Sequence, residues 1–173
     1  MRFRLSSFEF GIDIKNLKEI IRWRAVTEAP GTPSFIEGFI RLRSMSVPVI
    51  DLRKRFSLDP GAAEPTRIMI TLLDGHIAGL VVDEVADITA GGKELKLKCE
   101  GPEARGGHEA RPWDGCIEAV LEADGKSVSI IRLPELLSKE DLRFFDAPAP
   151  EGEPLPLRAG KGCSETAEGD TEK

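Results

Sequence analysis

The sequence predicts an all-β fold, and three features of the chain support this. Short runs in which apolar and polar residues alternate recur along most of its length, which is typical of strands with one buried face. Turn formers such as Asp74-Gly75 separate these runs. A good helix start is found only near the C-terminal end. We therefore expect about nine or ten short strands with tight turns, arranged as barrels or a sandwich.

Length and composition fit one globular domain, or two small ones that share a core. The chain has 173 residues, of which 40% are apolar and 31% charged, as is ordinary for a soluble protein. Its net charge of −6 argues against nucleic-acid binding through the overall field of the protein. We expect no nucleic-acid partner.

The compartment predicted from the sequence is the cytoplasm. Cys99, Cys116 and Cys163 are odd in number and irregular in spacing, which argues against a disulfide framework and for a reducing compartment. The first residues do not form a signal peptide, and no apolar stretch has the length of a membrane helix. We expect no direct membrane insertion, so that any work at a membrane requires a partner.

The N-terminal region begins with a predicted hairpin and continues into an ambiguous segment. Apolar residues alternate with polar ones over 3–14, with one slip at Ser6-Ser7. Over 14–23 the apolar residues fall at helical spacing, which locally favours a short amphipathic helix. The β-branched content and the lack of a strong N-cap before Lys15 oppose a helix. From the residues alone, both structures remain open.

The stretch 38–56 is the centre of the predicted fold. Two apolar runs flank an arginine-bearing link at 41–46, and the second run, 47–52, reads as a buried strand. Before this stretch, Thr32 is expected to cap a single helical turn with Pro33 at its first position. After it, Asp51 and the basic residues 53–55 are expected to return the chain to water.

The second half of the chain reads as further strands, a helix and a tail. The helix is predicted from Leu133 to about Phe145, with Pro134 near its first position. A Gly-rich mobile loop is expected at 100–112, and a disordered acidic tail at 147–173. The other predicted strands are bounded by turn formers and span residues 67–73, 77–88, 94–99, 116–122 and 127–131.

Motifs for catalysis, cofactor binding or metal binding are weak. No serine has a nucleophile-elbow context, and Gly91-Gly92-Lys93 lacks the spacing of a phosphate loop. Asp51 and Asp83 read as solvated strand ends rather than as an acid/base pair. Cys99, His108 and Cys116 are widely spaced and lack a fourth ligand, so a zinc-dependent or thiol enzyme is the weaker reading. We expect no catalytic, cofactor-binding or metal-binding residues.

A partner contact is the more interesting possibility. Arg43 lies in the central link, and its planar guanidinium suits bidentate pairing with a carboxylate. On composition alone, a solvated turn arginine is the better interpretation.

The sequence order then adds information that single residues do not. The chain carries F-G-I-D-I at 10–14, L-K-E-I at 17–20, T-P-S-F-I-E-G-F-I at 32–40, V-P-V-I-D-L-R-K-R-F at 47–56, T-R-I-M-I at 66–70 and A-G-L-V-V-D-E-V-A-D-I at 78–88.

This order resembles the CheW-like domain of bacterial chemotaxis proteins, from about Phe3 to Leu137. The resemblance implies two five-stranded, SH3-like β-barrels packed over a shared hydrophobic core, with a short C-terminal helix, in a domain at 1–146. It implies extended structure over 14–23, where strand pairing overrides the helical pattern. It also implies a non-catalytic adaptor of two-component signal transduction. Its partners would be a methyl-accepting chemoreceptor tip and the regulatory domain of a CheA-like histidine kinase, and it would be recruited to membrane receptor arrays.

Four residues carry the family's receptor-contact positions. They are Leu17 and Glu19 in the L-K-E-I segment, Arg43 in the central turn, and Gly38, which shapes the approach to that turn. The kinase contact implied by the family is an apolar contact between barrels, which is not assigned to residues. The family's central turn usually reads Asn-Leu-Arg-Gly, whereas here residues 41–44 read Arg-Leu-Arg-Ser. Ser44 tolerates a positive φ poorly if the glycine position requires one. An adaptor of a non-flagellar chemosensory pathway, controlling surface motility, development or gene expression, is the alternative.

Overall fold

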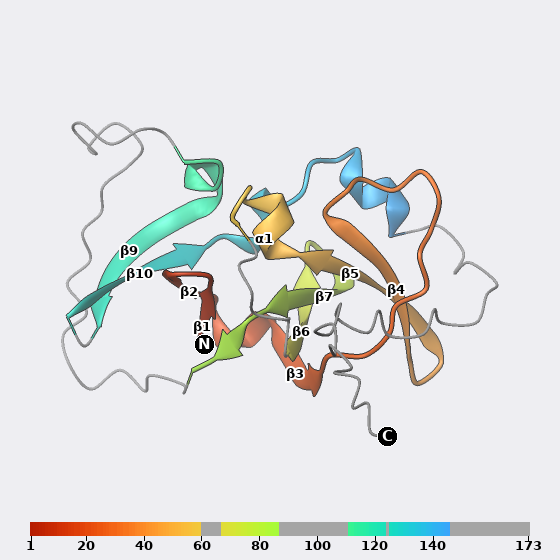
Figure 1. The fold of residues 1–173 in the computed structure, drawn as a ribbon, viewed down its shortest axis with the longest axis horizontal. Coiled ribbons are helices and arrows are strands. Elements are labelled where there is room, and N and C mark those ends of the chain that lie inside the picture. The colour runs from red at the N-terminus through yellow and green to blue at the C-terminus, as the bar shows by residue number, and fades with distance from the viewer. Residues whose placement is uncertain (60–66, 87–110, 124, 146–173) are drawn as a thin grey trace, which may run out of the picture.

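Two five-stranded sheets lie side by side along the long axis of the molecule (Figure 1). The computed structural model describes residues 1–59, 67–86, 111–123 and 125–145. Sheet A has the strand order β8-β1-β2-β10-β9, and sheet B has the order β3-β6-β7-β5-β4. The predicted all-β fold is confirmed.

Sheet A combines four strands from the two ends of the described chain with β8 from its middle. The antiparallel hairpin of β1 and β2 sits at its centre, and β10 joins β2 in parallel. Its strands are β1 (Arg2–Leu5), β2 (Phe8–Gly11), β8 (Glu84–Val85), β9 (Ile117–Ala123) and β10 (Lys126–Ile131).

Sheet B comes from one continuous stretch of sequence. The hairpins β4–β5 and β6–β7 are joined through the parallel pair β5–β7, and β3 pairs antiparallel with β6. As predicted, the β6–β7 hairpin turns at Asp74-Gly75, where both residues have positive φ. The strands are β3 (Leu17–Arg22), β4 (Ile36–Leu42), β5 (Met45–Asp51), β6 (Arg67–Leu73) and β7 (His76–Val82).

Helices are short wherever the structure describes the chain. The predicted helix over 133–145 is instead two separate 3-10 helices, because the segment is divided by the Ser138–Asp141 turn. Thr32 caps no helix, since its hydroxyl donates to the carbonyl of Ala29. The elements are η1 (Ile14–Asn16), α1 (Leu52–Arg55), η2 (Asp114–Cys116), η3 (Leu133–Glu135) and η4 (Asp141–Phe144). None of the helices in the described ranges is long and apolar enough to cross a membrane.

Segment 14–23, for which the residues alone left both helix and strand open, is mostly extended. After one 3-10 turn, the chain enters β3, where Ile21 pairs with Ile68 and Arg22 with Arg67 of β6. A register shift lies between Leu17 and Glu19. Exposure nevertheless alternates along β3, with Leu17, Glu19 and Ile21 half-buried and Lys18, Ile20 and Arg22 exposed. The apolar residues looked helical in spacing because Ile20 is an apolar residue at an exposed position of the strand.

Two hydrophobic cores form. We call the first the junction core, since it contains buried residues of both sheets and of α1, among them Phe3, Phe10, Leu52, Phe56 and Leu80. The second, which we call the sheet B core, lies within the curve of sheet B and contains Ile40, Leu42, Val47, Val49, Ile68, Ile70 and Val81. As predicted, residues 47–52 are buried, but the strand ends at Asp51 and Leu52 begins α1.

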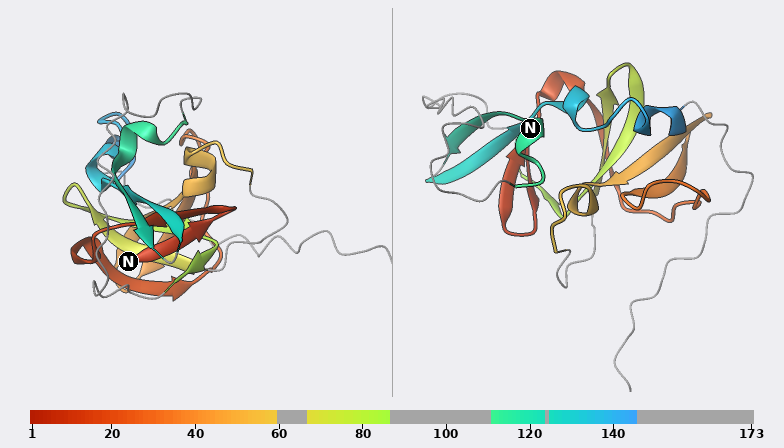
Figure 2. Two further views of the ribbon diagram at one scale, coloured as in Figure 1. Left: turned by 90° about the vertical axis from the view of Figure 1, so that its left-hand side faces the viewer. Right: turned by 90° about the horizontal axis from the view of Figure 1, so that it is seen from above.

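The chain passes between the two sheets at three places, which Figure 2 shows from above. The first is between β2 and β3, the second is Asp83 between β7 and β8, and the third follows β10. In the third, the ring of Phe145 beyond η4 contacts the ring of His76 at the start of β7. His76 is half-buried, and this aromatic contact covers part of its ring.

The expectation that Asp51, Arg53 and Asp83 are solvated is also wrong. Asp51 ends β5 and caps α1, and its exposed fraction is 3%, while Arg53 is 4% and Asp83 7% exposed. They are buried because α1 turns back onto the end of sheet B instead of continuing into water. The predicted strand over 94–99, the loop at 100–112 and the tail at 147–173 lie outside the described residues.

Candidate partner-binding surface

The first part of the candidate surface is β3, an edge strand of sheet B. Leu17 packs against the junction core, whereas Ile21 packs against the sheet B core. The register shift turns these two side chains to different faces although they are four residues apart. Glu19 is paired with Ile70 and is only half-buried, so its carboxylate lies at the margin of sheet B.

The second part is the two-residue turn between β4 and β5. Arg43 has a φ of 55°, a left-handed conformation that L-residues adopt at a cost. Ser44 is not among the described residues with positive φ. The strained position of this turn is therefore Arg43, and a serine at position 44 adds no left-handed strain.

Arg43 and Glu19 form a loose ion pair that brings the two parts together. The distance from Arg43 Nη2 to Glu19 Oε1 is 3.9 Å, and the side chains are 81% and 38% exposed. This distance is too long for a hydrogen bond, so the guanidinium keeps its donors free of Glu19. Arg43 thus lies near Glu19 at the margin of sheet B, while most of its side chain is open to water.

Gly38 is buried in β4, where the strand lies against the segment that contains Thr27. Its φ is 142°, and a Cβ built there would lie 2.4 Å from the carbonyl oxygen of Thr27. Thr27 exchanges two backbone hydrogen bonds of 2.8 Å with Phe39. Glycine is therefore required for the segment before β4 to lie against the strand. Gly38 shapes the path of β4 and presents no side chain to a partner.

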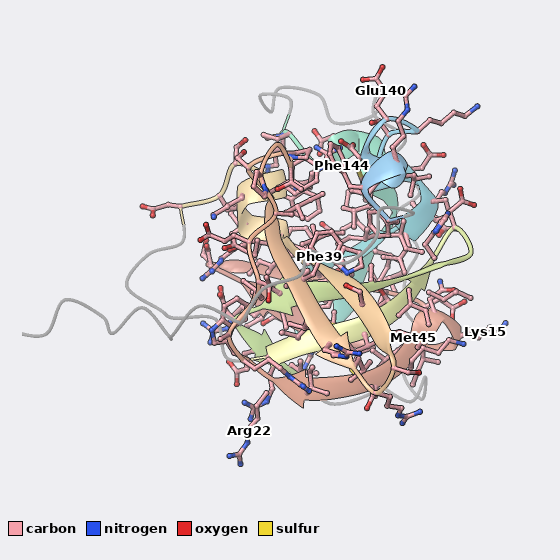
Figure 3. The ribbon with its side chains drawn as sticks, turned by 90° about the vertical axis from the view of Figure 1, so that its right-hand side faces the viewer. Lys15, Arg22, Phe39, Met45, Glu140 and Phe144 are labelled. Atoms are coloured by element: carbon pink, nitrogen blue, oxygen red, sulfur yellow. The ribbon has the colours of Figure 1, made fainter. Side chains whose placement is uncertain are left out.

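Three large apolar side chains are exposed on η1, β3 and β5, and the predictions from the sequence did not identify them as surface residues. Ile14 is 44% exposed, Ile20 38% and Met45 45%; these are the exposed large hydrophobic residues of the described chain. Ile14 and Ile20 flank Leu17 in sequence, and Met45 follows the Arg43 turn. Figure 3 shows Met45 and Lys15 on the same side of sheet B. The sequence held one signal for this exposure: Ile20 and Ile21 are adjacent, so in a strand their side chains point to opposite faces and one of them faces outward.

This surface carries groups for contact, and its four predicted residues include no nucleophile or imidazole. Within the described ranges, no group of three His, Cys, Asp or Glu side chains is placed to hold a metal ion. Cys99 and His108 lie outside those ranges. Burial raises the pKa of the Cys116 thiol, and its Sγ donates to the carbonyl of Glu135 at 3.0 Å. A thiol of this kind is a poor nucleophile at neutral pH.

Fold and surface together define an all-β module of two packed sheets with a mixed charged and apolar contact surface. A family model described as "CheW-like domain" matches residues 1–141. The chain belongs to the CheW-like domain family, which confirms the resemblance inferred from the sequence.

Individual relatives support this assignment. The Chemotaxis protein CheW of Bacillus subtilis is 32% identical over 140 residues, which cover 80% of this chain and 85% of that protein. Protein FrzA of Myxococcus xanthus is 33% identical over 84 residues, covering 49% of this chain and 52% of FrzA. A crystal structure of the scaffolding protein TtCheW from Thermoanaerobacter tengcongensis is similar, with a TM-score of 0.67 and 32% identity over 81% of this chain and 87% of that one.

Proposed function

We propose that this protein is a non-catalytic adaptor that couples chemoreceptors to a CheA-like histidine kinase. Arg43, held beside Glu19 at the margin of sheet B, carries this proposal. A forked guanidinium that is mostly exposed can pair bidentately with a carboxylate of a receptor tip. Met45, which is exposed and begins β5 directly after the Arg43 turn, would add apolar contact area beside it. Family membership supports the same function.

The two partners would bind at separate faces of one rigid molecule. Leu17, Glu19 and Arg43 would meet the receptor, with Gly38 keeping β4 in position. The kinase regulatory domain would bind elsewhere through an apolar contact, and the adaptor would be recruited to membrane receptor arrays. Control of kinase activity would follow from contacts that differ between kinase states.

We further propose that each sheet closes as an SH3-like barrel. The supporting observation is the curl of sheet B. Its strand order places β3 at one edge and β4 at the other, yet Glu19 of β3 lies 3.9 Å from Arg43 of the β4–β5 turn. A flat sheet of five strands separates its edges by about 19 Å.

The test is receptor binding by Arg43→Glu. We expect its affinity for a cytoplasmic receptor fragment from the same cell to fall about tenfold or more, because a carboxylate would face the partner's acidic group. Thermal unfolding should change little, since the side chain is exposed. Arg132→Glu is the matched control, because Arg132 is also an exposed arginine but follows β10 of sheet A, outside the candidate surface, and it should leave receptor binding unchanged. Unchanged receptor binding by Arg43→Glu would contradict the proposal.

A second candidate keeps the adaptor role in a non-flagellar chemosensory pathway. Arg41 and Ser44 in place of the usual asparagine and glycine favour it, because an added cation at the turn suits a more acidic partner. Affinity capture from the native cell at low salt, followed by identification of the co-purifying kinase, distinguishes the two. A kinase encoded with flagellar genes would reject this candidate.

A further inference from the structure

Three charged side chains lie inside the molecule where the two sheets meet. Asp51, Arg53 and Asp83 are each at least nine-tenths buried, and none of them belongs to the candidate partner-binding surface. Asp51 ends β5, Arg53 lies in α1, and Asp83 is the residue at which the chain leaves sheet B for sheet A. The cluster therefore sits at a crossing point between the sheets.

Arg53 connects the two carboxylates through directed bonds. Its Nε and Nη2 donate to Asp51 at 3.1 and 2.8 Å, and its Nη1 donates to Asp83 at 3.1 Å. Burial disfavours the charged guanidinium, but the hydrogen bonds and charges of Asp51 and Asp83 outweigh burial and raise the pKa of Arg53. Arg53 therefore stays charged, and its guanidinium stays hydrogen-bonded to Asp51 and Asp83.

Asp83 extends the cluster into sheet A. Its Oδ2 accepts a hydrogen bond of 2.6 Å from the backbone N–H of Ser6, in the turn between β1 and β2. Ser6 has a φ of 52°, and its hydroxyl donates to the carbonyl of Asp59. The backbone N–H of Asp83 donates to the carbonyl of Arg4 at 3.2 Å. A continuous set of polar bonds thus runs from sheet B through Arg53 to the β1–β2 turn of sheet A.

The cluster and the junction core differ in what they can specify. Apolar contact between the sheets is favourable but non-directional, so it tolerates small rotations of one sheet on the other. A planar guanidinium with fixed donor directions tolerates few of them, because each misplaced carboxylate would remain buried without its partner. Buried ion pairs add little net stability compared with apolar packing, and fixing one arrangement is the better-supported role for them.

We propose that the Asp51–Arg53–Asp83 cluster is a joint that fixes the orientation of sheet A on sheet B, so that both sheets behave as one body. The proposal does not depend on which partners the protein binds. For any adaptor with contact faces on both sheets, the joint would hold those faces at one mutual angle.

Hydrogen exchange tests the joint in the unaltered protein. If the joint holds, the Ser6 amide exchanges only through global unfolding, at a free energy similar to that of protected amides in β6 and β7. In Arg53→Met, the Ser6 amide should exchange more than about tenfold faster than in the wild type, while the β6 and β7 amides keep most of their protection. A wild-type Ser6 amide that exchanges through easy local opening would overturn the proposal.

The two tryptophans allow a second test. Trp113 is buried in the junction core, and Trp23 packs against the sheet B core. Trp23→Phe and Trp113→Phe variants leave one reporter each, and urea unfolding should give coincident midpoints when Arg53 is present. With Arg53→Met, we expect the Trp113 midpoint to fall below that of Trp23.

Controls separate orientation from stability. Lys54→Met changes the next, exposed residue of α1 and should leave the two midpoints coincident. Arg53→Lys keeps the charge but loses the fork, so it should separate the midpoints even if Arg53→Met does not fold. Midpoints that fall together in the Arg53 variants would show that the cluster only adds stability, and the joint would be rejected.

Discussion

The junction core and the sheet B core bury apolar side chains in two different ways. Rings meet in the junction core, where Phe10, Phe56 and Trp113 have centroids 5.5 to 5.9 Å apart. The buried members of the sheet B core are all isoleucine, valine or leucine. Strands joined by backbone hydrogen bonds lie at a fixed spacing that β-branched side chains fill well. Facing surfaces of two separate sheets are farther apart, and large rings fill that space.

This difference indicates which core decides the tertiary structure. Sheet B acquires its register from its own hairpins, so its core follows from pairing along a continuous stretch. The junction core requires Phe3 and Phe10 from the start of the chain and Leu133 and Leu136 from near its end. We therefore expect the junction to be the more sensitive region.

The largest expected effect is that of Phe56→Ala. Phe56 is fully buried and contacts both Phe10 and Trp113, so its removal leaves a cavity between the sheets. The free energy of unfolding should fall by about 3–5 kcal/mol. Urea denaturation measures this, and Leu80→Ala in the junction core against Ile70→Ala in the sheet B core compares deletions of equal size, each at about 2–5 kcal/mol. A loss from Leu80→Ala no larger than that from Ile70→Ala would contradict the ranking of the two cores.

Gly38→Ala comes next and tests sheet B. The added Cβ would meet the Thr27 carbonyl at 2.4 Å, so we expect a loss of about 2–3 kcal/mol. Gly75→Ala is the matched control, because Gly75 also has positive φ but no atom within 4 Å of its Cβ position. Its loss should be about 1 kcal/mol. Equal thermal shifts for the two variants would mean that the clash with Thr27 is relieved by movement of the chain.

Cys116 predicts a smaller, pH-dependent effect in the junction core. Burial raises the pKa of its thiol in the folded protein. Below the ordinary thiol pKa, the thiol is protonated in both the folded and the unfolded protein. Above it, the thiol of the unfolded protein ionises first, which lowers the free energy of the unfolded state relative to the folded state. Wild-type stability should therefore fall more steeply than that of Cys116→Ala as pH rises from about 8 to 10. Urea unfolding across this range measures both slopes, and parallel slopes would argue that the thiol is accessible.

The smallest effect is expected at the β4–β5 turn. Ser44→Gly should change the free energy of unfolding by less than about 0.5 kcal/mol, because the positive φ belongs to Arg43. Arg43→Gly should instead relieve left-handed strain and raise stability by up to about 1 kcal/mol. A clear gain from Ser44→Gly, measured by thermal unfolding, would show that the left-handed residue is the serine after all.

Local sequence features predict the strands well and the short helices poorly. The Asp74-Gly75 turn and the alternating runs around it specify the β6–β7 hairpin through interactions between near neighbours. The segment over 133–145 has a proline and leucines suited to a helix, yet the Ser138–Asp141 turn divides it. Hydrogen bonds of a side chain to nearby backbone compete with helix formation, and apolar periodicity does not record them.

The candidate surface was predictable in part. The family pattern identifies Leu17, Glu19, Gly38 and Arg43, and the structure brings Glu19 and Arg43 together while burying Gly38. Ile20 is exposed because it lies at an outward position of the edge strand β3, and Met45 because it lies at the start of β5, and both placements are set by pairing between segments. Partner contact at these positions stays a prediction until binding is measured.

The sequence by itself determined the all-β class, the hairpin turns, the buried strand at 47–52 and the family, because these depend on periodicity, turn chemistry and residue order along the chain. Only the tertiary structure decided that Asp51, Arg53 and Asp83 are buried together. The physical reason is that a charge enters the interior only with its partners, and Asp83 reaches Arg53 from 30 residues away. Asp51 and Asp83, which look like solvated strand ends in the sequence, therefore belong to the buried hydrogen-bonded cluster that links the two sheets.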